Sequence, residues 1–215
     1  MTKIPLGEKI GSGVHRETFE VKGQPRKIAK VLRDWFVLRI GTALKIHIPG
    51  IALKVLSFIR YGTLNVNEYE RDILASLPKS VMRYVACCPE IAETTDGRTA
   101  LINTRLKNFD GTFAQTLHSH GPVNNPAFWQ HWNHLFLICK KENIALYDVF
   151  RNPKNILVHK ISETEWVPMI IDVKSLNATN TYLDILPIIS KTIMWARIDA
   201  HEKKTRRRYE VKQIK

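Results

Sequence analysis

Two polar side chains in the second half of the chain could hold a metal ion beside phosphates. Asn155 lies in the run Pro153-Lys-Asn-Ile-Leu-Val158, and Asp172 follows the apolar run Met169-Ile-Ile. An amide oxygen and a carboxylate oxygen are hard donors of the kind that Mg²⁺ takes beside nucleotide phosphates. The pair therefore predicts a site for Mg²⁺ and ATP, with Asn155 closing a loop and Asp172 ending the next strand.

A glycine-bearing turn near the start could receive the phosphates. Gly11 and Gly13 lie in Gly11-Ser-Gly-Val-His-Arg16, and glycine lets backbone N–H groups approach a phosphate closely. By itself such a pair of glycines is weak evidence, and a plain hairpin is the alternative explanation of the turn. Arg16 closes the turn and is a candidate side-chain donor to a phosphate.

A lysine at the centre of an apolar segment points to the same chemistry. Lys30 lies in Ile28-Ala-Lys-Val-Leu32, and a buried ammonium without a partner is costly. It needs an acid or a phosphate, and Glu70 is the natural candidate. The plainer alternative is a lysine that points into solvent.

Hydrophobic periodicity predicts the elements that would position these residues. Residues 5–31 alternate at period two and predict three strands, and further strands are expected around Val81–Val85 and Thr99–Thr104. A hairpin is expected around the turn Ser162-Glu-Thr-Glu165. Three segments carry apolar residues at helical spacing and predict helices: residues 65–77, 126–143 and 182–197.

Taken in their order along the chain, the motifs around Gly11, Lys30, Glu70, Asn155 and Asp172 resemble those of the YrbL family, called PhoP regulatory network proteins. This bacterial family has a protein-kinase-like fold and is related to small lipopolysaccharide and sugar kinases. The resemblance covers roughly residues 6–176 and also includes Phe109-Asp-Gly111. It implies that Lys30 holds nucleotide phosphates, that Glu70 orients Lys30, and that Asn155 and Asp172 bind Mg²⁺.

The resemblance also implies an α+β, two-lobed fold. Residues 1–104 would form an N-lobe, a small antiparallel sheet with one helix. Residues 105–215 would form a mostly helical, truncated C-lobe. ATP with Mg²⁺ is expected between the lobes.

The catalytic base is where the sequence departs from protein kinases. Their catalytic Asp lies five residues before the metal-binding Asn, a position that Phe150 occupies here. Asp148 is the candidate base if a bulge near Pro153 brings it into place. Loss of a general base costs roughly 10²–10⁴-fold in rate. Two readings stay open: an ATP-dependent phosphotransferase, and a catalytically impaired pseudokinase that serves as a nucleotide-binding regulatory module.

The net charge of +13 favours anionic partners, which include nucleotides, phosphorylated sugars, acidic lipids and nucleic acids. Few residues follow Asp172, so we expect a small anionic acceptor of the sugar or lipid type in preference to a protein. A basic envelope-associated or nucleic-acid-binding protein is the remaining alternative. The nucleic-acid-binding alternative rests on the net charge and on the run Arg206-Arg-Arg208. It is not favoured, because no helix-turn-helix, zinc-finger or RNA-binding signature accompanies that run.

Residues 33–61 mix basic and large apolar side chains. Such a segment suits a helix in a membrane interface, where basic side chains reach anionic headgroups. It would then give peripheral contact with an anionic membrane. The alternative is a helical insertion packed on the N-lobe. The basic residues concerned are Arg33, Arg39, Lys45, Lys54 and Arg60.

Three cysteines, Cys87, Cys88 and Cys139, give no even disulfide framework and are expected to be buried thiols. The start of the chain has no apolar core of signal-peptide length. We therefore expect a cytoplasmic protein, with a peripheral position at the inner membrane face as an extension. A zinc site is a minor alternative, drawn from four histidines: His118, His120, His131 and His134.

Overall fold

The structure is a computed structural model of the 215-residue chain. It describes residues 3–12, 16–33, 35–40, 44–49, 65–86, 90–173 and 187–211. The chain divides into two compact units. The first contains residues 1–75 and 87–105, and the second contains residues 76–86 and 106–215. Residues 76–86, which the sequence assigned to the N-lobe, thus group with the second unit.

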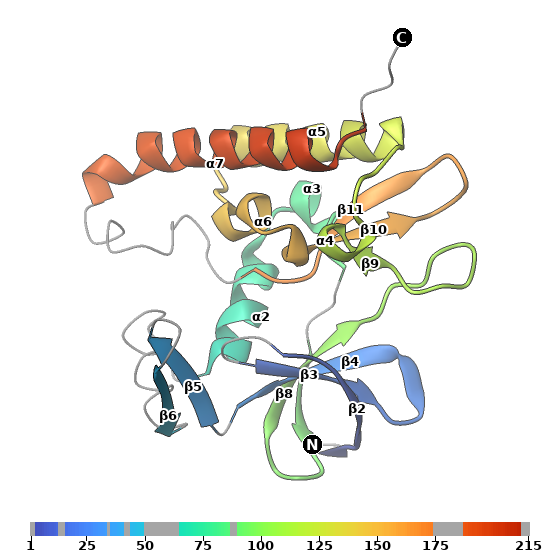
Figure 1. Cartoon of the computed structure of the whole chain (residues 1–215), viewed down its shortest axis with the longest axis vertical. Helices are drawn as coiled ribbons and strands as arrows, with labels where there is room; N and C mark the ends of the chain where they lie inside the picture. Colours follow the sequence, from blue (N-terminus) through green and yellow to red (C-terminus); the bar gives the residue numbers. More distant parts are fainter. Residues whose placement is uncertain are drawn as a thin grey trace. The chain divides into compact units, whose positions relative to one another are not determined.

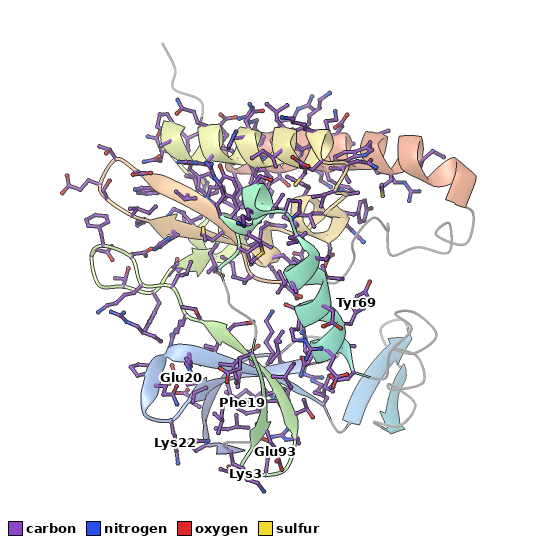
Figure 2. All side chains as sticks on the ribbon, turned by 180° about the vertical axis from the view of Figure 1, so that it is seen from behind. Lys3, Phe19, Glu20, Lys22, Tyr69 and Glu93 are labelled. Atoms are coloured by element: carbon purple, nitrogen blue, oxygen red, sulfur yellow. The ribbon has the colours of Figure 1, made fainter. Side chains whose placement is uncertain are left out.

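The first unit contains a six-stranded sheet, in the order β1-β7-β8-β4-β3-β2. Its strands β2, β3, β4 and β8 are labelled in Figure 1. All neighbouring strands are antiparallel except β1 and β7, which run parallel and carry an ion pair between Lys3 and Glu93 (Figure 2). The three strands expected within residues 5–31 are confirmed as β2, β3 and β4. The strands are β1 (Lys3–Ile4), β2 (Leu6–Ser12), β3 (Arg16–Val21), β4 (Gln24–Leu32), β7 (Glu90–Thr94) and β8 (Thr99–Thr104).

Small and β-branched residues fill the core of this sheet. Ala29 and Val31 of β4 pack with Ala100 and Ile102 of β8, and all four are buried. Lys30, between Ala29 and Val31, points to the opposite face because side chains alternate along a strand. β4 therefore buries apolar side chains on one face and presents a lysine on the other.

Helix α2 (Val66–Ser76) confirms the helix expected over residues 65–77. Its buried residues include Val66, Glu70, Ile73 and Leu74, which share one face at helical spacing. The Asn65 side chain accepts a hydrogen bond from the Asn67 backbone N–H at 3.0 Å and begins the helix. An acid thus lies on the buried stripe of an otherwise apolar helix face.

The helix expected within residues 33–61 is wrong for the described part of that segment. Strands β5 (Trp35–Ile40) and β6 (Leu44–Pro49) pair antiparallel as a hairpin. Aromatic and β-branched residues favour such extended pairing, and short apolar runs do not distinguish strand from helix by periodicity. Residues 50–61, which the same expectation covers, lie outside the described residues.

The second unit combines helices with a three-stranded sheet, in the order β11-β10-β9. Its strands are β9 (Gln115–Thr116), β10 (Ile156–Lys160) and β11 (Trp166–Ile170). Its helices are α3 (Lys79–Met82), α4 (Leu117–His120), α5 (Pro126–Lys141), α6 (Tyr147–Arg151), the 3₁₀ turn η1 (Pro153–Asn155) and α7 (Pro187–Tyr209). The hairpin expected around residues 162–165 is confirmed by the pairing of β10 with β11.

Helix α3 replaces the strand expected around Val81–Val85. Pro78 precedes it as the N-cap residue with extended backbone, and Val81 N–H and Met82 N–H donate to the Pro78 carbonyl oxygen at 2.9 Å. Val81 and Tyr84 are buried. The apolar residues here belong to a short helix and the turn after it, and the strand that precedes the turn at residues 95–98 is β7.

Helices α5 and α7 lie side by side in both views (Figures 1 and 2). Asn125 caps α5, since its side chain accepts from the Phe128 N–H at 3.0 Å, and Trp132 Nε1 donates to Glu202 Oε1 of α7 at 3.1 Å. α5 confirms the helix expected over residues 126–143. The helix expected over residues 182–197 is confirmed from Pro187 onward as α7, which continues to Tyr209, whereas residues 182–186 lie outside the described residues. Within the described ranges, no helix has the length and apolar character needed to cross a membrane.

Candidate functional site

Lys30 and Glu70 form a buried pair in the first unit. Lys30 Nζ donates to Glu70 Oε1 at 2.9 Å, and the two residues are 8% and 0% exposed. With the Asn103 amide oxygen turned toward Nζ, Asn103 of β8 lies 3.2 Å from the same ammonium. The contact expected from the sequence is therefore present, and it meets the requirement that a buried ammonium be partnered. The roles of both residues at a nucleotide stay predictions.

Arg16 lies on the other oxygen of the same carboxylate. Its Nη1 forms an ion pair with Glu70 Oε2 and reaches Asn67 Oδ1 at 3.3 Å. Among the described residues Oε2 accepts no well-aligned hydrogen bond, so this contact is one of charge. Two cations thus share Glu70. Arg16 faces Glu70 in this structure, and its expected contact with a phosphate stays a prediction.

Asn67 connects these side chains to the sheet. It is fully buried, and its Nδ2 lies 3.2 Å from the carbonyl oxygens of both Lys30 and Thr99. The sequence analysis missed Asn67 and Asn103. A signal for Asn67 was present, since it lies three residues before Glu70 and therefore shares its helix face. Asn103 lacked such a signal, because its position depends on strand pairing.

The glycine turn is only partly described. Gly11 pairs with Thr18 of β3, after a register shift between Lys9 and Gly11. A Cβ added at Gly11 would meet the Thr18 side chain at 3.6 Å, an ordinary contact, so packing does not require glycine there. Gly13 lies outside the described residues. The phosphate-binding roles of both glycines stay predictions.

Asp148 and Asn155 come together in the second unit. Asn155 Nδ2 donates to Asp148 Oδ2 at 2.9 Å and lies 3.2 Å from the Asp148 carbonyl oxygen. The single turn of α6 and the 3₁₀ turn η1 take up the residues between them. Asn152 caps η1 by accepting from the Lys154 N–H at 3.2 Å. The side chain of Asp148 thus reaches Asn155 despite two more intervening residues than the protein-kinase pattern has.

Asp172 is placed close to Asn155 by the backbone. The Ile171 N–H donates to the Asn155 carbonyl oxygen at 3.0 Å, and Asp172 is the next residue, half-buried beyond the end of β11. Because the Asn155 amide nitrogen faces Asp148, its oxygen lies on the opposite side of the group. An amide oxygen and nearby carboxylates fit the donor set that Mg²⁺ prefers.

Phe150 belongs to the core. It is 0% exposed, and its ring meets those of Trp132 and Phe136 edge to face at centroid distances of 5.4 Å. Its carbonyl oxygen accepts from Thr205 Oγ1 of α7 at 3.3 Å. The ring at the usual base position therefore packs between α5 and α6 and offers no proton acceptor, while the carbonyl group of the residue links α6 to α7.

The four histidines considered for zinc do not form a metal cluster in the described part of the chain. Instead, Tyr84 Oη lies 3.2 Å from His131 Nδ1 and 2.8 Å from His134 Nδ1. Burial lowers the pKa of His131, and the charge of Glu165 acts in the opposite direction. This cluster packs α5 against the turn that follows α3.

No protein-family model matches the chain, and no curated protein matches it. Among solved structures, it is similar to the Rio2 kinase of Chaetomium thermophilum in an ADP/Mg²⁺-phosphoaspartate complex, with a TM-score of 0.56 and 15% identity. The match covers 100% of this chain and 59% of that chain, so the chain spans about 59% of the length of the Rio2 kinase chain. Membership of the YrbL family stays a prediction. The comparison shows that the chain has the α+β, protein-kinase-like fold that its sequence predicted.

Proposed function

We propose that the chain is an ATP- and Mg²⁺-dependent phosphotransferase of the protein-kinase-like superfamily. The observation that carries the proposal is the contact of Asp148 with Asn155, because it unites the candidate base with a candidate metal ligand. The buried Lys30–Glu70 pair supports it. The Rio2 kinase structure contains ADP and Mg²⁺, which agrees with this chemistry for the fold.

Phosphoryl transfer depends mainly on positioning and on electrostatic stabilisation. In the proposed reaction Glu70 orients Lys30, and Lys30 binds phosphate oxygens. Asn155 and Asp172 would hold Mg²⁺, and the ion would supply positive charge that stabilises the transferred phosphoryl group. Asp148 accepts the proton of the acceptor hydroxyl, with its carboxylate oriented by Asn155. The acceptor oxygen forms a bond to the γ-phosphorus while the bond from that phosphorus to the β–γ bridging oxygen breaks, and ADP leaves.

The proposed acceptor is a small anionic or membrane-associated molecule of the sugar or lipid type. The net charge of +13 supports an anionic acceptor, and the resemblance to the YrbL family supports the chemical class. Peripheral contact with an anionic membrane through the basic and apolar residues of 33–61 is part of the same proposal, but it no longer rests on a helix, because β5 and β6 form a hairpin. Transfer of labelled γ-phosphate to a panel of sugars, lipid headgroups and proteins tests it, and labelling of proteins alone would refute it.

A second candidate is a nucleotide-binding regulatory module without catalysis. The burial of Phe150 favours it, since no acid can act from that position. Both candidates predict stabilisation by ATP with Mg²⁺. They differ in ATP turnover, which only the phosphotransferase predicts.

Thermal unfolding of the full chain with and without ATP, Mg²⁺ and a chelator tests both candidates. Ligand at 100 times its Kd stabilises the folded state by about 2.7 kcal/mol, so a rise in Tm that requires Mg²⁺ is expected. The Asp148→Asn variant should keep this rise and lose ATP turnover. Asp110→Asn, in an exposed turn, is the matched control and should keep both. If ATP does not shift Tm, both candidates fail.

A double-mutant cycle tests whether Lys30 and Asp172 act on the same nucleotide. Lys30→Met and Asp172→Asn should each weaken ATP binding in the presence of Mg²⁺. If both side chains act on the same triphosphate, the two losses are not additive, since residues that share a ligand couple. Additive losses would contradict the assignment of Lys30 and Asp172 to a common site.

A further inference from the structure

Four basic side chains form one exposed face near the C-terminal end of α7. We call Lys203, Lys204, Arg207 and Arg208 the basic face. All four are exposed, whereas Glu202, Thr205 and Tyr209 on the other side of the helix are buried. Their spacing places them on adjacent turns of one surface. Together with Ala200 they line an open hollow of about 560 Å³.

The acidic side chains Asp199 and Glu202 of α7, and Glu210 directly after the helix, are engaged elsewhere. Asp199 pairs with Lys140 of α5 at 3.1 Å, and Glu210 pairs with Arg206 at 3.2 Å. The buried Glu202 accepts from Trp132. No ion pair joins the basic face to an acid in the described part of the chain. Its four charges therefore act together on whatever approaches this surface.

The positive charge extends from the basic face toward α6. The pKa of His201 is lowered first by burial and then by the charges of Arg151, Lys204 and Arg197. Arg151 belongs to α6, and its guanidinium lies 5.7 Å from the centre of the Tyr147 ring. The Tyr147 hydroxyl contacts His201 at 3.2 Å. Cations of two helices thus contribute to one positive field around His201.

Cations near a helix C-terminus also interact favourably with the helix dipole, but that effect does not require four of them on one face. A membrane-bound helix needs large apolar side chains between its cations, whereas the hollow contains Ala200. Binding of a single nucleic acid strand relies on aromatic side chains that stack on bases, and the neighbouring aromatic residue Tyr209 is 4% exposed. The composition of the face thus favours a partner recognised by charge density.

We propose that the basic face of α7 binds double-stranded DNA through its phosphates, without reading the base sequence. A DNA duplex carries one charge per ~1.7 Å of its axis, a density that suits four cations on adjacent helical turns. The wide major groove of B-form DNA admits an α-helix, so cations along one helix face can reach phosphates at the edges of the groove without contacting bases, whereas the major groove of A-form RNA is too narrow for side chains to enter. This surface is separate from the residues assigned to phosphoryl transfer, so either proposal can fail alone.

Salt dependence gives the expected magnitude. If each of the four cations neutralises one phosphate, the slope of log K against log salt is about −3.6. Raising the salt from about 50 to 200 mM should then weaken binding roughly 150-fold. Neutralising the whole face should remove most of that slope.

Fluorescence anisotropy with a labelled duplex of about 20 base pairs tests the proposal on the full chain. The variant Lys203→Gln, Lys204→Gln, Arg207→Gln and Arg208→Gln should lose at least about 100-fold in affinity at low salt. The matched control neutralises four exposed lysines outside the face and should bind within about threefold of the wild type. Its changes are Lys22→Gln, Lys27→Gln, Lys107→Gln and Lys141→Gln, and Lys22 is visible in Figure 2.

Three outcomes would overturn the proposal. The first is no binding of the wild type at low salt. The second is an equal loss in the control, which would mean that net charge, and not this face, is responsible. The third is equal or tighter binding to an RNA duplex, to a single strand or to phosphatidylserine vesicles. Circular dichroism shows whether each variant folds. If the quadruple variant does not fold, the Lys203/Lys204 and Arg207/Arg208 pairs are neutralised separately. Each pair should then change the slope of log K against log salt by about half as much.

Discussion

Glu70 contacts two buried cations, so replacing it should cost more than replacing either cation. The side chains of Glu70, Arg16 and Lys30 are 0%, 5% and 10% exposed. Removing one partner from a buried ion pair costs about 3–5 kcal/mol, and we expect this loss in the free energy of unfolding for Glu70→Gln. For a chain of this size it corresponds to a decrease in Tm of about 6–20 °C. Lys30→Met should cost about 1–3 kcal/mol, because Arg16 still neutralises Glu70.

Urea denaturation without nucleotide, followed by circular dichroism, measures these differences. Glu68→Gln is the matched control, since Glu68 is exposed on the same helix and accepts from the Asn65 side chain at 3.0 Å. It should change stability by less than about 0.5 kcal/mol. The reasoning is refuted if Glu70→Gln costs less than about 1 kcal/mol, or if Lys30→Met costs more than Glu70→Gln.

Three further predictions concern the second unit. Phe150→Ala should lower the free energy of unfolding by about 3–5 kcal/mol in urea, because it empties a buried aromatic site; a loss below about 1 kcal/mol would show that the ring is not part of the core. Burial raises the pKa of Cys139 to about 12. At pH 8, iodoacetamide should therefore label Cys139 in urea but not in the native protein, as measured by peptide mass spectrometry, and labelling of the native protein would contradict its burial. Burial lowers the pKa of His131 and His201 below 6.5, so the unfolded chain binds more protons than the folded chain. The free energy of unfolding in urea should therefore fall as the pH drops below about 6.5, and less steeply in His131→Gln. A free energy of unfolding that rises toward pH 5 would contradict this.

The polar pair of the first unit could be anticipated from local chemistry. A lysine among apolar strand residues requires a partner, and Glu70 was the acid on the apolar side of the next helix. The inference that Lys30 and Glu70 pair uses only their chemistry, and it does not depend on how far apart they lie in the sequence. The approach of Asp148 to Asn155 was expected to need a bulge near Pro153, and α6 and η1 supply the extra turn.

Other features depend on tertiary contacts, which the hydrophobic periodicity of the sequence does not predict. The segments at residues 35–49 and 81–85 are short apolar runs, which fit a strand or a helix equally well. The direction of Arg16 toward Glu70 follows from strand pairing, as does the position of Asn103. The exposure of the basic face also required the structure, since the sequence alone does not show which side of α7 is covered.

The discontinuous second unit has a consequence for dissecting the protein. A fragment ending at residue 105 would retain residues 76–86 but lack α5, so that Val81 and Tyr84, both buried in the intact chain, would be in contact with water. The complementary fragment from residue 106 would lack the backbone partners that Tyr84 and Ala86 provide to Ile170. Cutting between the units in sequence would thus damage the second of them. Separate expression would require residues 76–86 to be fused to the later segment, as in a circularly permuted chain.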